Sequence, residues 1–389
     1  MHSGRMIFSQ LLDFLPKYEF NCCVARYHGN RRVRNFSCFD QFLCMAFAQL
    51  TGRESLREIE TCLRAMRTKL YHAGLRGLIA RSTLADANEN RDWRIFADFA
   101  QVLIRRARQL YADDSFGVEL EATVYALDST TIDLCLSLFP WAHFRRHKAA
   151  IKLHTLLDLK GLIPCFIYIT EGKANDNRVF PVIVPEAGSY YVMDRGYKNL
   201  RYLHGFHQAQ AFFVTRAQPN IAFRRRSYQR VDKSAGGRSD QTIMLSGPKS
   251  SRLYPDPLRL VRYFDADDKK HFVFLTNNFM LPPLTVAQLY RCRWQIEVFF
   301  KLIKQHLRIK AFYGTSLNAV KTQIWIATSV YVLVAILKKE LRLERNLNEI
   351  LQIVSITLFE KMLIAEAVTT NFPQIVKEPC HNQLQLFDF

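Results

Sequence analysis

Val124-Tyr-Ala-Leu-Asp128 is an apolar run that ends in a carboxylate, and Tyr190-Tyr-Val-Met-Asp194 repeats this pattern later in the chain. Short runs of β-branched and aromatic residues predict strands. Because α/β sheets bind ligands at the carboxyl ends of their strands, neighbouring strands would bring both aspartates to one edge. Two carboxylates suffice for Mg²⁺, which completes its shell with water and phosphate oxygens. The alternative for each aspartate taken alone is a helix or turn cap.

The surrounding segments predict a mixed α/β protein. Further strands are predicted at Ala150–Asp158, Ile163–Thr170 and Phe212–Thr215, and a helix at Leu200–Ala211. The stretch before this core has apolar residues at helical spacing. We therefore predict five parts: a helical N-terminal domain, the first part of an α/β core, a β-rich insertion, the last part of the core, and a helical C-terminal region with a tail. Their bounds are 1–115, 116–215, 216–280, 281–315 and 316–389.

A helix predicted at Thr285–Ile309 carries a third acid on a basic stripe. At about 100° per residue, its polar side chains fall on one face and its apolar side chains on the other. The polar stripe holds Tyr290, Arg293, Glu297, Lys301 and Lys304. Lysine and arginine can clamp phosphates while the glutamate supplies a metal ligand. The alternative is a solvated face with a salt bridge between Glu297 and Lys301.

The charge of the chain favours a polyanionic partner. Its 389 residues include 54 Lys and Arg against 35 Asp and Glu, which gives a net charge of +19. The surplus falls in three regions, at 1–110, 216–271 and 285–345, with net charges of +8, +7 and +8. Separate basic regions suit double-stranded DNA better than a small anion; an anionic membrane is the second choice, and a merely solvated basic surface is the simplest alternative. The same charge favours the helical N-terminal domain as a DNA-binding domain over a packing cap.

Other features predict a cytoplasmic protein. The nine cysteines show no C-x-x-C spacing, which favours reduced thiols over a zinc site. Asp13 and Lys17 interrupt the apolar N-terminus, so no secretory signal is predicted. The apolar run Thr322–Leu337 is shorter than the ~20 residues of a membrane span. We expect a buried core helix there and no membrane partner.

These motifs resemble those of a known family, the DDE transposases of bacterial insertion sequences, in the insertion-sequence-four group. The strand ending in Asp128 comes first, and Asp194-Arg-Gly-Tyr197 is similar to the family's D-x-G-Y. Tyr290-x₂-Arg293-x₃-Glu297-x₆-Lys304 then fits the Y-R-E-K signature of that group at every position. The helical stretch with Arg91-Asp92-Trp93 also resembles the domain that precedes the core in one branch.

The resemblance implies an α/β, ribonuclease-H-like catalytic core with a β-rich insertion between the second aspartate and the glutamate. It implies two Mg²⁺ or Mn²⁺ ions per active site, one on Asp128 and Asp194 and the other on Asp128 and Glu297. Water would cut at the transposon end, and the freed 3′-OH would form a hairpin or join target DNA. Tyr290, Arg293 and Lys304 would hold the DNA backbone, and the protein would act as a homodimer.

Two further groups are candidates for DNA contact. Lys152 and His154 share one face of a predicted strand. They can line the edge of the site, and a structural histidine is an equal alternative. Arg224, Arg225 and Arg226 suit phosphate contacts or form a solvated run. Asp176 is a candidate supporting acid or a turn residue, and Trp294 a stacking or a packing residue.

The C-terminal segment carries a separate hypothesis. Gln383-Leu-Gln-Leu-Phe387 resembles the short peptide by which bacterial proteins dock on the replication sliding clamp. In that reading Gln383 is the anchor, while Leu384, Leu386 and Phe387 supply the apolar contacts. The alternative is a tail that folds onto the core.

Two other functions compete with transposition. A nuclease or resolvase on the same core would use the same two-metal chemistry. A DNA-binding protein derived from an inactive transposase would need no acids, whereas all three are present here.

Overall fold

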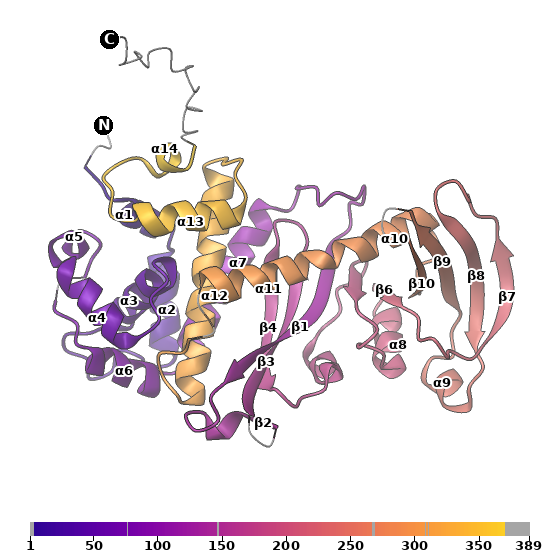
Figure 1. The fold of residues 1–389 in the computed structure, drawn as a ribbon, viewed down its shortest axis with the longest axis horizontal. Coiled ribbons are helices and arrows are strands. Elements are labelled where there is room, and N and C mark those ends of the chain that lie inside the picture. Colours follow the sequence, from indigo (N-terminus) through magenta and orange to yellow (C-terminus); the bar gives the residue numbers. More distant parts are fainter. Residues whose placement is uncertain are drawn as a thin grey trace, which may run out of the picture.

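The computed structural model describes residues 4–75, 77–145, 148–266, 269–307, 309 and 311–369. Helices gather at one end of an elongated molecule, and one long sheet extends from them to the other end (Figure 1). The clamp-like segment Gln383–Phe387 lies outside the described residues.

The N-terminal part is helical, as predicted. Its helices are α1 (Ile7–Leu12), α2 (Lys17–Arg26), α3 (Cys38–Leu50), α4 (Leu56–Ala65), α5 (Arg67–Tyr71), α6 (Arg81–Asn90) and α7 (Arg94–Leu110). The Ser55 side chain caps α4 by accepting from the backbone N–H of Glu58. The helices α1 and α2 are separate, because Pro16 between them cannot continue a helix.

Ten strands form one sheet. They are β1 (Val124–Leu134), β2 (His143–Arg145), β3 (Lys148–Asp158), β4 (Ile163–Glu171), β5 (Tyr190–Met193), β6 (Phe212–Arg216), β7 (Phe223–Gln229), β8 (Gly237–Leu245), β9 (Leu258–Asp265) and β10 (Lys270–Thr276). Two 3₁₀ turns, η1 (Pro140–Ala142) and η2 (Asp176–Val182), flank β2 and β4.

The central strands have the predicted ribonuclease-H-like arrangement. Their order is β4-β3-β1-β5-β6, with β1, β3 and β4 antiparallel and β5 and β6 parallel to β1. Helix α8 (Leu200–Gln208) connects β5 to β6. All four residues of β5 are buried, which explains why its sequence is a continuous apolar run.

One detail of the prediction is wrong: Asp128 does not end its strand. β1 continues to Leu134, because Ser129 and the residues after it remain paired with β3. Only the parallel pairing with β5 stops at Leu127, which lies opposite Met193. The carboxylate of Asp128 therefore lies where two neighbouring strands diverge.

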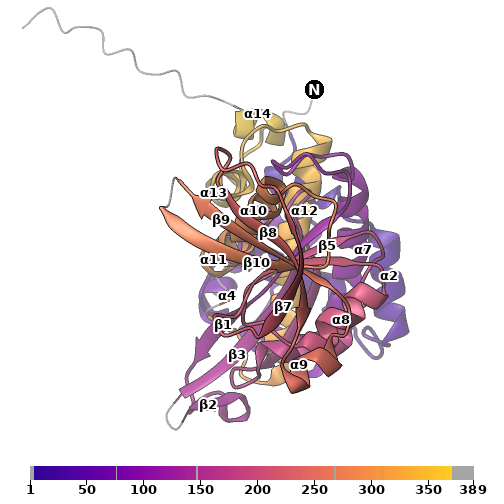
Figure 2. The same cartoon turned by 90° about the vertical axis from the view of Figure 1, so that its right-hand side faces the viewer.

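The strands of residues 216–280 extend the core sheet. β10 pairs with β6, and β9, β8 and β7 follow outward; Figure 2 looks along the molecule from this end. Helix α9 (Pro248–Leu253) connects β8 to β9. A buried ion pair between Arg259 and Asp240, with N–O distances of 2.9 and 2.7 Å, links β9 to β8. Arg259 also donates to the carbonyl of Leu281, so it ties these strands to the chain that returns to the core.

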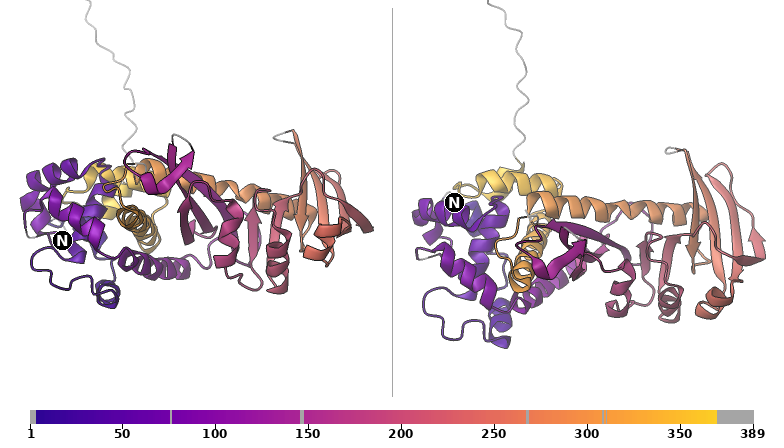
Figure 3. Two further views of the ribbon diagram at one scale, coloured as in Figure 1. Left: turned by 90° about the horizontal axis from the view of Figure 1, so that it is seen from below. Right: turned by 60° about the horizontal axis from the view of Figure 1, so that its bottom comes forward.

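The C-terminal helices cover one side of the core. They are α10 (Pro283–Cys292), α11 (Trp294–His306), α12 (Leu317–Glu340), α13 (Leu347–Thr357) and α14 (Ile364–Thr369). The single helix predicted at Thr285–Ile309 is therefore two, which meet at Arg293. Arg293 keeps helical dihedral angles (φ −52°, ψ −32°), so α10 and α11 form one nearly straight rod (Figure 3).

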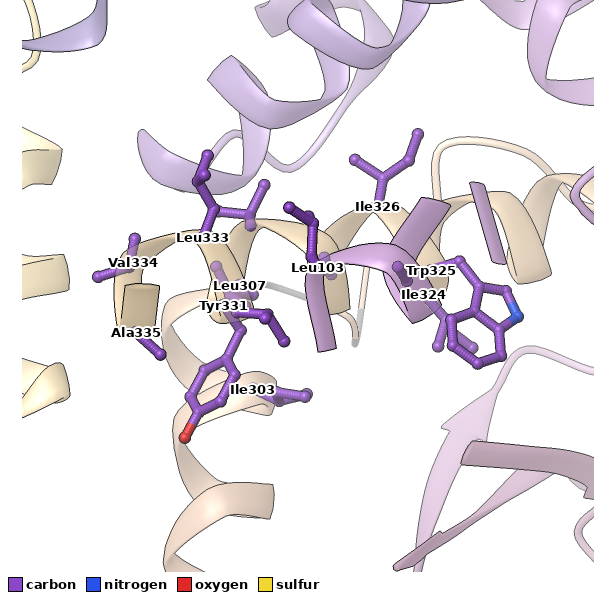
Figure 4. Close-up of a cluster of buried hydrophobic side chains, with 14 of the residues drawn as sticks. Leu103, Ile303, Leu307, Ile324, Trp325, Ile326, Tyr331, Leu333, Val334 and Ala335 are labelled. Carbon is purple, nitrogen blue, oxygen red and sulfur yellow. The ribbon is translucent and has the colours of Figure 1, made fainter. Parts of the chain in front are cut away.

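Helix α12 is the centre of the helical part. Its length and apolar composition would suit a membrane span, but 94% of its most apolar window is buried inside the protein. Ile324, Tyr331 and Leu333 of α12 pack with Leu103 of α7 and Ile303 of α11 (Figure 4). The apolar run is thus the core helix that the sequence predicted.

Candidate active site

The two aspartates come together because their strands are parallel neighbours. Leu127 of β1 lies opposite Met193 of β5, and Asp128 and Asp194 are the next residue of each strand. Both side chains then lie at the same level of the sheet, where the parallel pairing ends. The predicted juxtaposition of the two acids is present, although only β5 ends there.

Helix α11 brings the third acid to this edge. Arg293 Nη1 donates to Asp128 Oδ2 at 2.9 Å, and Nη2 donates to Glu297 Oε1 at 2.6 Å. Arg293 and Glu297 are four residues apart and share one helix face. One guanidinium therefore joins the acid of β1 to the acid of α11, across 165 positions of the sequence.

Two more residues of the predicted stripe reach the same strands. The Tyr290 hydroxyl donates to Asp194 Oδ1 at 3.3 Å. Lys304 Nζ donates to Thr130 Oγ1 at 2.5 Å and to the Thr131 carbonyl at 2.8 Å. No sequence signal identified Thr130 and Thr131 as partners of Lys304, although they follow Asp128 closely in the chain. The contacts fix the α10–α11 rod over β1 at both ends of the site.

The neighbouring acids of the site favour a bound cation. Burial raises the pKa of Asp128 to about 6, and the neighbouring Glu297 and Asp194 add to this rise. Arg293 supplies part of this positive charge. Among the described residues, no group of three acidic, histidine or cysteine side chains is arranged to hold a metal ion. The guanidinium instead lies between two of the three carboxylates, which are oxygen ligands of the kind that Mg²⁺ and Mn²⁺ prefer.

A cleft of about 840 Å³ opens beside Asp194 toward the strands β8–β10. Its wall includes Asp194, Tyr290, Arg293 and Trp294. Trp294 is 61% exposed, which argues against the alternative of a packing residue and leaves that of a stacking residue. The same wall carries cations and aromatic rings that the sequence analysis missed: Arg216, Lys233, Arg238, Tyr263, Phe264 and Phe272. Its position directly after the predicted strand Phe212–Thr215 is the sequence signal that could have identified Arg216 as a residue of the site.

The opposite face of β1 is closed by internal hydrogen bonds. Ser129 Oγ donates to Asp176 Oδ1 at 2.6 Å, and Lys152 Nζ lies 3.1 Å from the same oxygen. His154, opposite Ser129 in the register, is fully buried, and its Nε2 lies 3.0 Å from Thr170 Oγ1. Burial lowers the pKa of His154 to about 4. This geometry favours the structural role that was the alternative for His154, and it gives Lys152 an internal partner in Asp176.

The remaining predicted cations lie away from the acids. Arg224, Arg225 and Arg226 are exposed on β7, the edge strand at the far end of the sheet (Figure 1). Lys301 is exposed on α11, and its side chain makes no ion pair with a described residue, so the suggested pair with Glu297 is absent.

The chain is similar to known transposases. Residues 119–333 match the family described as Transposase DDE domain, and residues 3–76 match a domain of unknown function. A Sinorhizobium fredii protein designated transposase y4zB is 33% identical over 286 residues, covering 72% of this chain and 78% of that protein. A transposase designated for insertion sequence element IS5377 of Geobacillus stearothermophilus is 30% identical over 224 residues, covering 57% of this chain and 58% of that protein.

A solved structure gives a weaker likeness. The piggyBac transposase synaptic complex with hairpin DNA is 9% identical, covers 91% of this chain and 78% of that chain, and has a TM-score of 0.44. That score is too low to bear on fold or function. The family match spans more than half of the chain and contains all three acids. The chain therefore belongs to the DDE transposases of bacterial insertion sequences.

Proposed function

We propose that Asp128, Asp194 and Glu297 are the catalytic acids of this DNA transposase. They would cut the phosphodiester at the ends of the insertion sequence and then join the freed 3′-OH to DNA. The observation that carries the proposal is the bridge from Arg293 to both Asp128 and Glu297, because it gathers acids from distant segments around one cation.

The DDE family uses divalent metal ions, and we propose two Mg²⁺ or Mn²⁺ ions for this site. When bound, the ions would activate the attacking oxygen and stabilise the leaving one. Asp128 would serve both ions, with Asp194 and Glu297 each serving one. Arg293 would then release the carboxylates and turn its guanidinium to a phosphate, for which its planar fork is suited. Tyr290 and Lys304 would hold the DNA backbone beside the cut.

The cleft next to the acids is the proposed entry of the DNA. Its wall offers Arg216, Lys233 and Arg238 to phosphates, and the exposed Trp294 to a base. Farther along the sheet, Arg224–Arg226 would extend the contact. The helical N-terminal part would bind DNA as well, through exposed cations such as Arg57 and Arg64 of α4.

Three further elements of the proposal concern assembly and location. We propose a homodimer that bridges two transposon ends, and docking on the replication sliding clamp through Gln383–Phe387. The protein would act in the cytoplasm, on the bacterial nucleoid. Deletion of residues 383–389 tests the docking, because unchanged clamp binding, or none by the intact chain, would exclude it.

The central experiment replaces Glu297 by Gln. The variant is incubated with Mg²⁺ and DNA that carries the element's own terminal repeat. We expect cleavage to be lost and DNA binding to be kept, because the amide preserves the shape of the side chain and removes its charge. Glu119→Gln is the matched control, since Glu119 is exposed and makes no hydrogen bond or ion pair with a described residue.

The outcomes separate the proposal from its rivals. Cleavage that survives Glu297→Gln would remove Glu297 from the site. Cleavage by the wild type without joined products would indicate a nuclease or resolvase. DNA binding without cleavage by the wild type would indicate a DNA-binding protein derived from a transposase.

A further inference from the structure

A second large concavity lies on another face of α11, away from β1. We name it the α11–α13 groove; it is lined by α11, by the end of α12, by the start of α13 and by the chain after α7. Its volume is about 1310 Å³, larger than the ~300–1,000 Å³ of small-molecule pockets. Part of its wall, from Lys338 to Gln352, lies beyond residue 333, where the family match ends.

The groove has a strong surplus of positive charge. Four of its residues are cationic, namely Lys301, Lys338, Lys339 and Arg342, whereas Asp114 is its single acid. Asp114 is already paired with Lys339. The side chains of Lys301, Lys338 and Arg342 make no hydrogen bond or ion pair with a described residue. Three uncompensated cations thus face one cavity.

The polar groups between these cations suit an anionic backbone. Five amide side chains line the groove, on Gln295, Gln305, Asn346, Asn348 and Gln352. Helix α13 begins in the wall: its N-cap is Asn346, and its first residue, Leu347, lines the groove. Helix N-termini present free backbone N–H groups to anions. Amides, lysines, arginines and helix N-termini are the usual donors to DNA phosphates.

A simpler explanation accounts for only some of these cations. Lys338 lies in the last turn of α12, where a positive charge complements the helix dipole. Lys301 lies in the middle of α11, and Arg342 lies beyond the end of α12. Arg342 is close enough to the C-terminus of α12 to gain from its dipole, whereas Lys301 gains from no helix end. The helix dipole therefore does not explain why Lys301 converges with Lys338 and Arg342 on one cavity.

The position of the groove connects it to the chemistry. Lys301 follows the proposed catalytic Glu297 by one helical turn, and Gln295 and Val298 of the groove wall flank that glutamate. A duplex that leaves the active site across α11 would therefore meet the groove next.

We propose that the α11–α13 groove binds the sugar–phosphate backbone of duplex DNA outside the cut bond. The inference rests on the proposed function, because it assumes that DNA is the substrate at Glu297. The bound segment is either the transposon end with its flank or the target DNA. Both offer the same phosphates, so Lys301, Lys338 and Arg342 recognise charge and not sequence.

The test replaces Lys301, Lys338 and Arg342 together by Gln in the full-length chain. Binding is measured against salt concentration, with Ca²⁺ in place of Mg²⁺. Three duplexes serve as probes: a terminal repeat ending at the cut, the same repeat with flanking DNA, and unrelated DNA as target. Each lost phosphate contact lowers the slope of log K against log salt by about 0.9. We expect a slope reduced by about 2.7 with the duplex that occupies the groove.

The matched control keeps the charge and changes the side chains. Lys301→Arg, Lys338→Arg and Arg342→Lys together should leave the slope as in the wild type. Thermal unfolding of both variants checks that each is folded. If the neutral variant has the wild-type slope with all three duplexes, the groove does not bind DNA, whereas the active-site proposal stands as long as the wild type cleaves. A wild type that neither binds nor cleaves would overturn both proposals.

Discussion

The two faces of strand β1 carry opposite kinds of polar chemistry. On the face toward α11, Asp128 and Thr130 meet the long cationic side chains of Arg293 and Lys304. On the other face, Ser129 contacts Asp176, and its register neighbour His154 is buried. Successive residues of a strand point to opposite faces, so a single step in sequence separates the two. On the face toward α11, the charged side chains can bind a ligand, whereas on the other face the internal hydrogen bonds hold the strand in place.

The largest expected difference between the faces is catalytic. Asp128→Asn should lower the cleavage rate by on the order of 10³-fold or more, because loss of a metal ligand removes several kcal/mol of transition-state stabilisation. Ser129→Ala, one residue along, loses one hydrogen bond of about 1 kcal/mol and should leave most of the activity. Single-turnover cleavage with saturating enzyme measures both. Equal losses in the two variants would break the distinction between the faces.

The next difference concerns stability against pH. His154 has a folded-state pKa of about 4, below its usual 6.5, because burial disfavours the charged ring. The unfolded chain therefore binds more protons between pH 6.5 and pH 4, and the folded state loses stability as the pH falls through this window. The full loss is about 3 kcal/mol.

Replacement of His154 by Gln tests this dependence. Urea unfolding is followed at several pH values, and the difference between wild type and variant isolates the histidine. We expect the advantage of the wild type to shrink by about 3 kcal/mol from pH 7 to pH 4. A constant difference over this range would mean that His154 is protonated, or exposed, in the folded protein.

The sequence predicted the chemistry of the first face better than its geometry. Tyr290, Arg293, Glu297 and Lys304 were placed on one stripe, because helical periodicity is a local property. That Arg293 would bridge Glu297 to Asp128 was not predictable, since the contact joins residues 165 positions apart. The continuation of β1 past Asp128 was missed although Thr130 and Thr131 are good strand formers, because it depends on pairing with β3, which lies elsewhere in the sequence.

For His154 on the second face, the sequence left DNA contact and a structural role as alternatives. Period two placed Lys152 and His154 together, but the sequence does not say which face of β3 is covered. Only the fold shows that η2 brings Asp176 to Lys152 and Ser129. The strands β7–β10 were predicted as a β-rich insertion. Their union with the core sheet depends on the pairing of β10 with β6, which has no local signature.

A smaller effect sharpens the role of the first face as a cation site. Arg293→Gln leaves Asp128 and Glu297 without their shared partner, and we expect a loss of about 2 kcal/mol in the absence of metal ions, since the group is only partly buried. A divalent ion should restore more stability to this variant than to the wild type, because no guanidinium then competes for the carboxylates. Thermal unfolding with increasing Ca²⁺ measures the effect. The same response in wild type and variant would separate Arg293 from the metal site.

The smallest expected effect compares one lysine from each face. Lys304→Met removes a cation over the site, and DNA affinity should fall by about tenfold at moderate salt, with the salt slope reduced by about 0.9. Lys152→Met removes the contact with Asp176 and the hydrogen bond to the Ala174 carbonyl. It should cost about 1 kcal/mol of stability and leave the salt slope unchanged. If Lys152→Met reduced the slope as much as Lys304→Met, Lys152 would contact DNA, and the two faces of β1 would share one function.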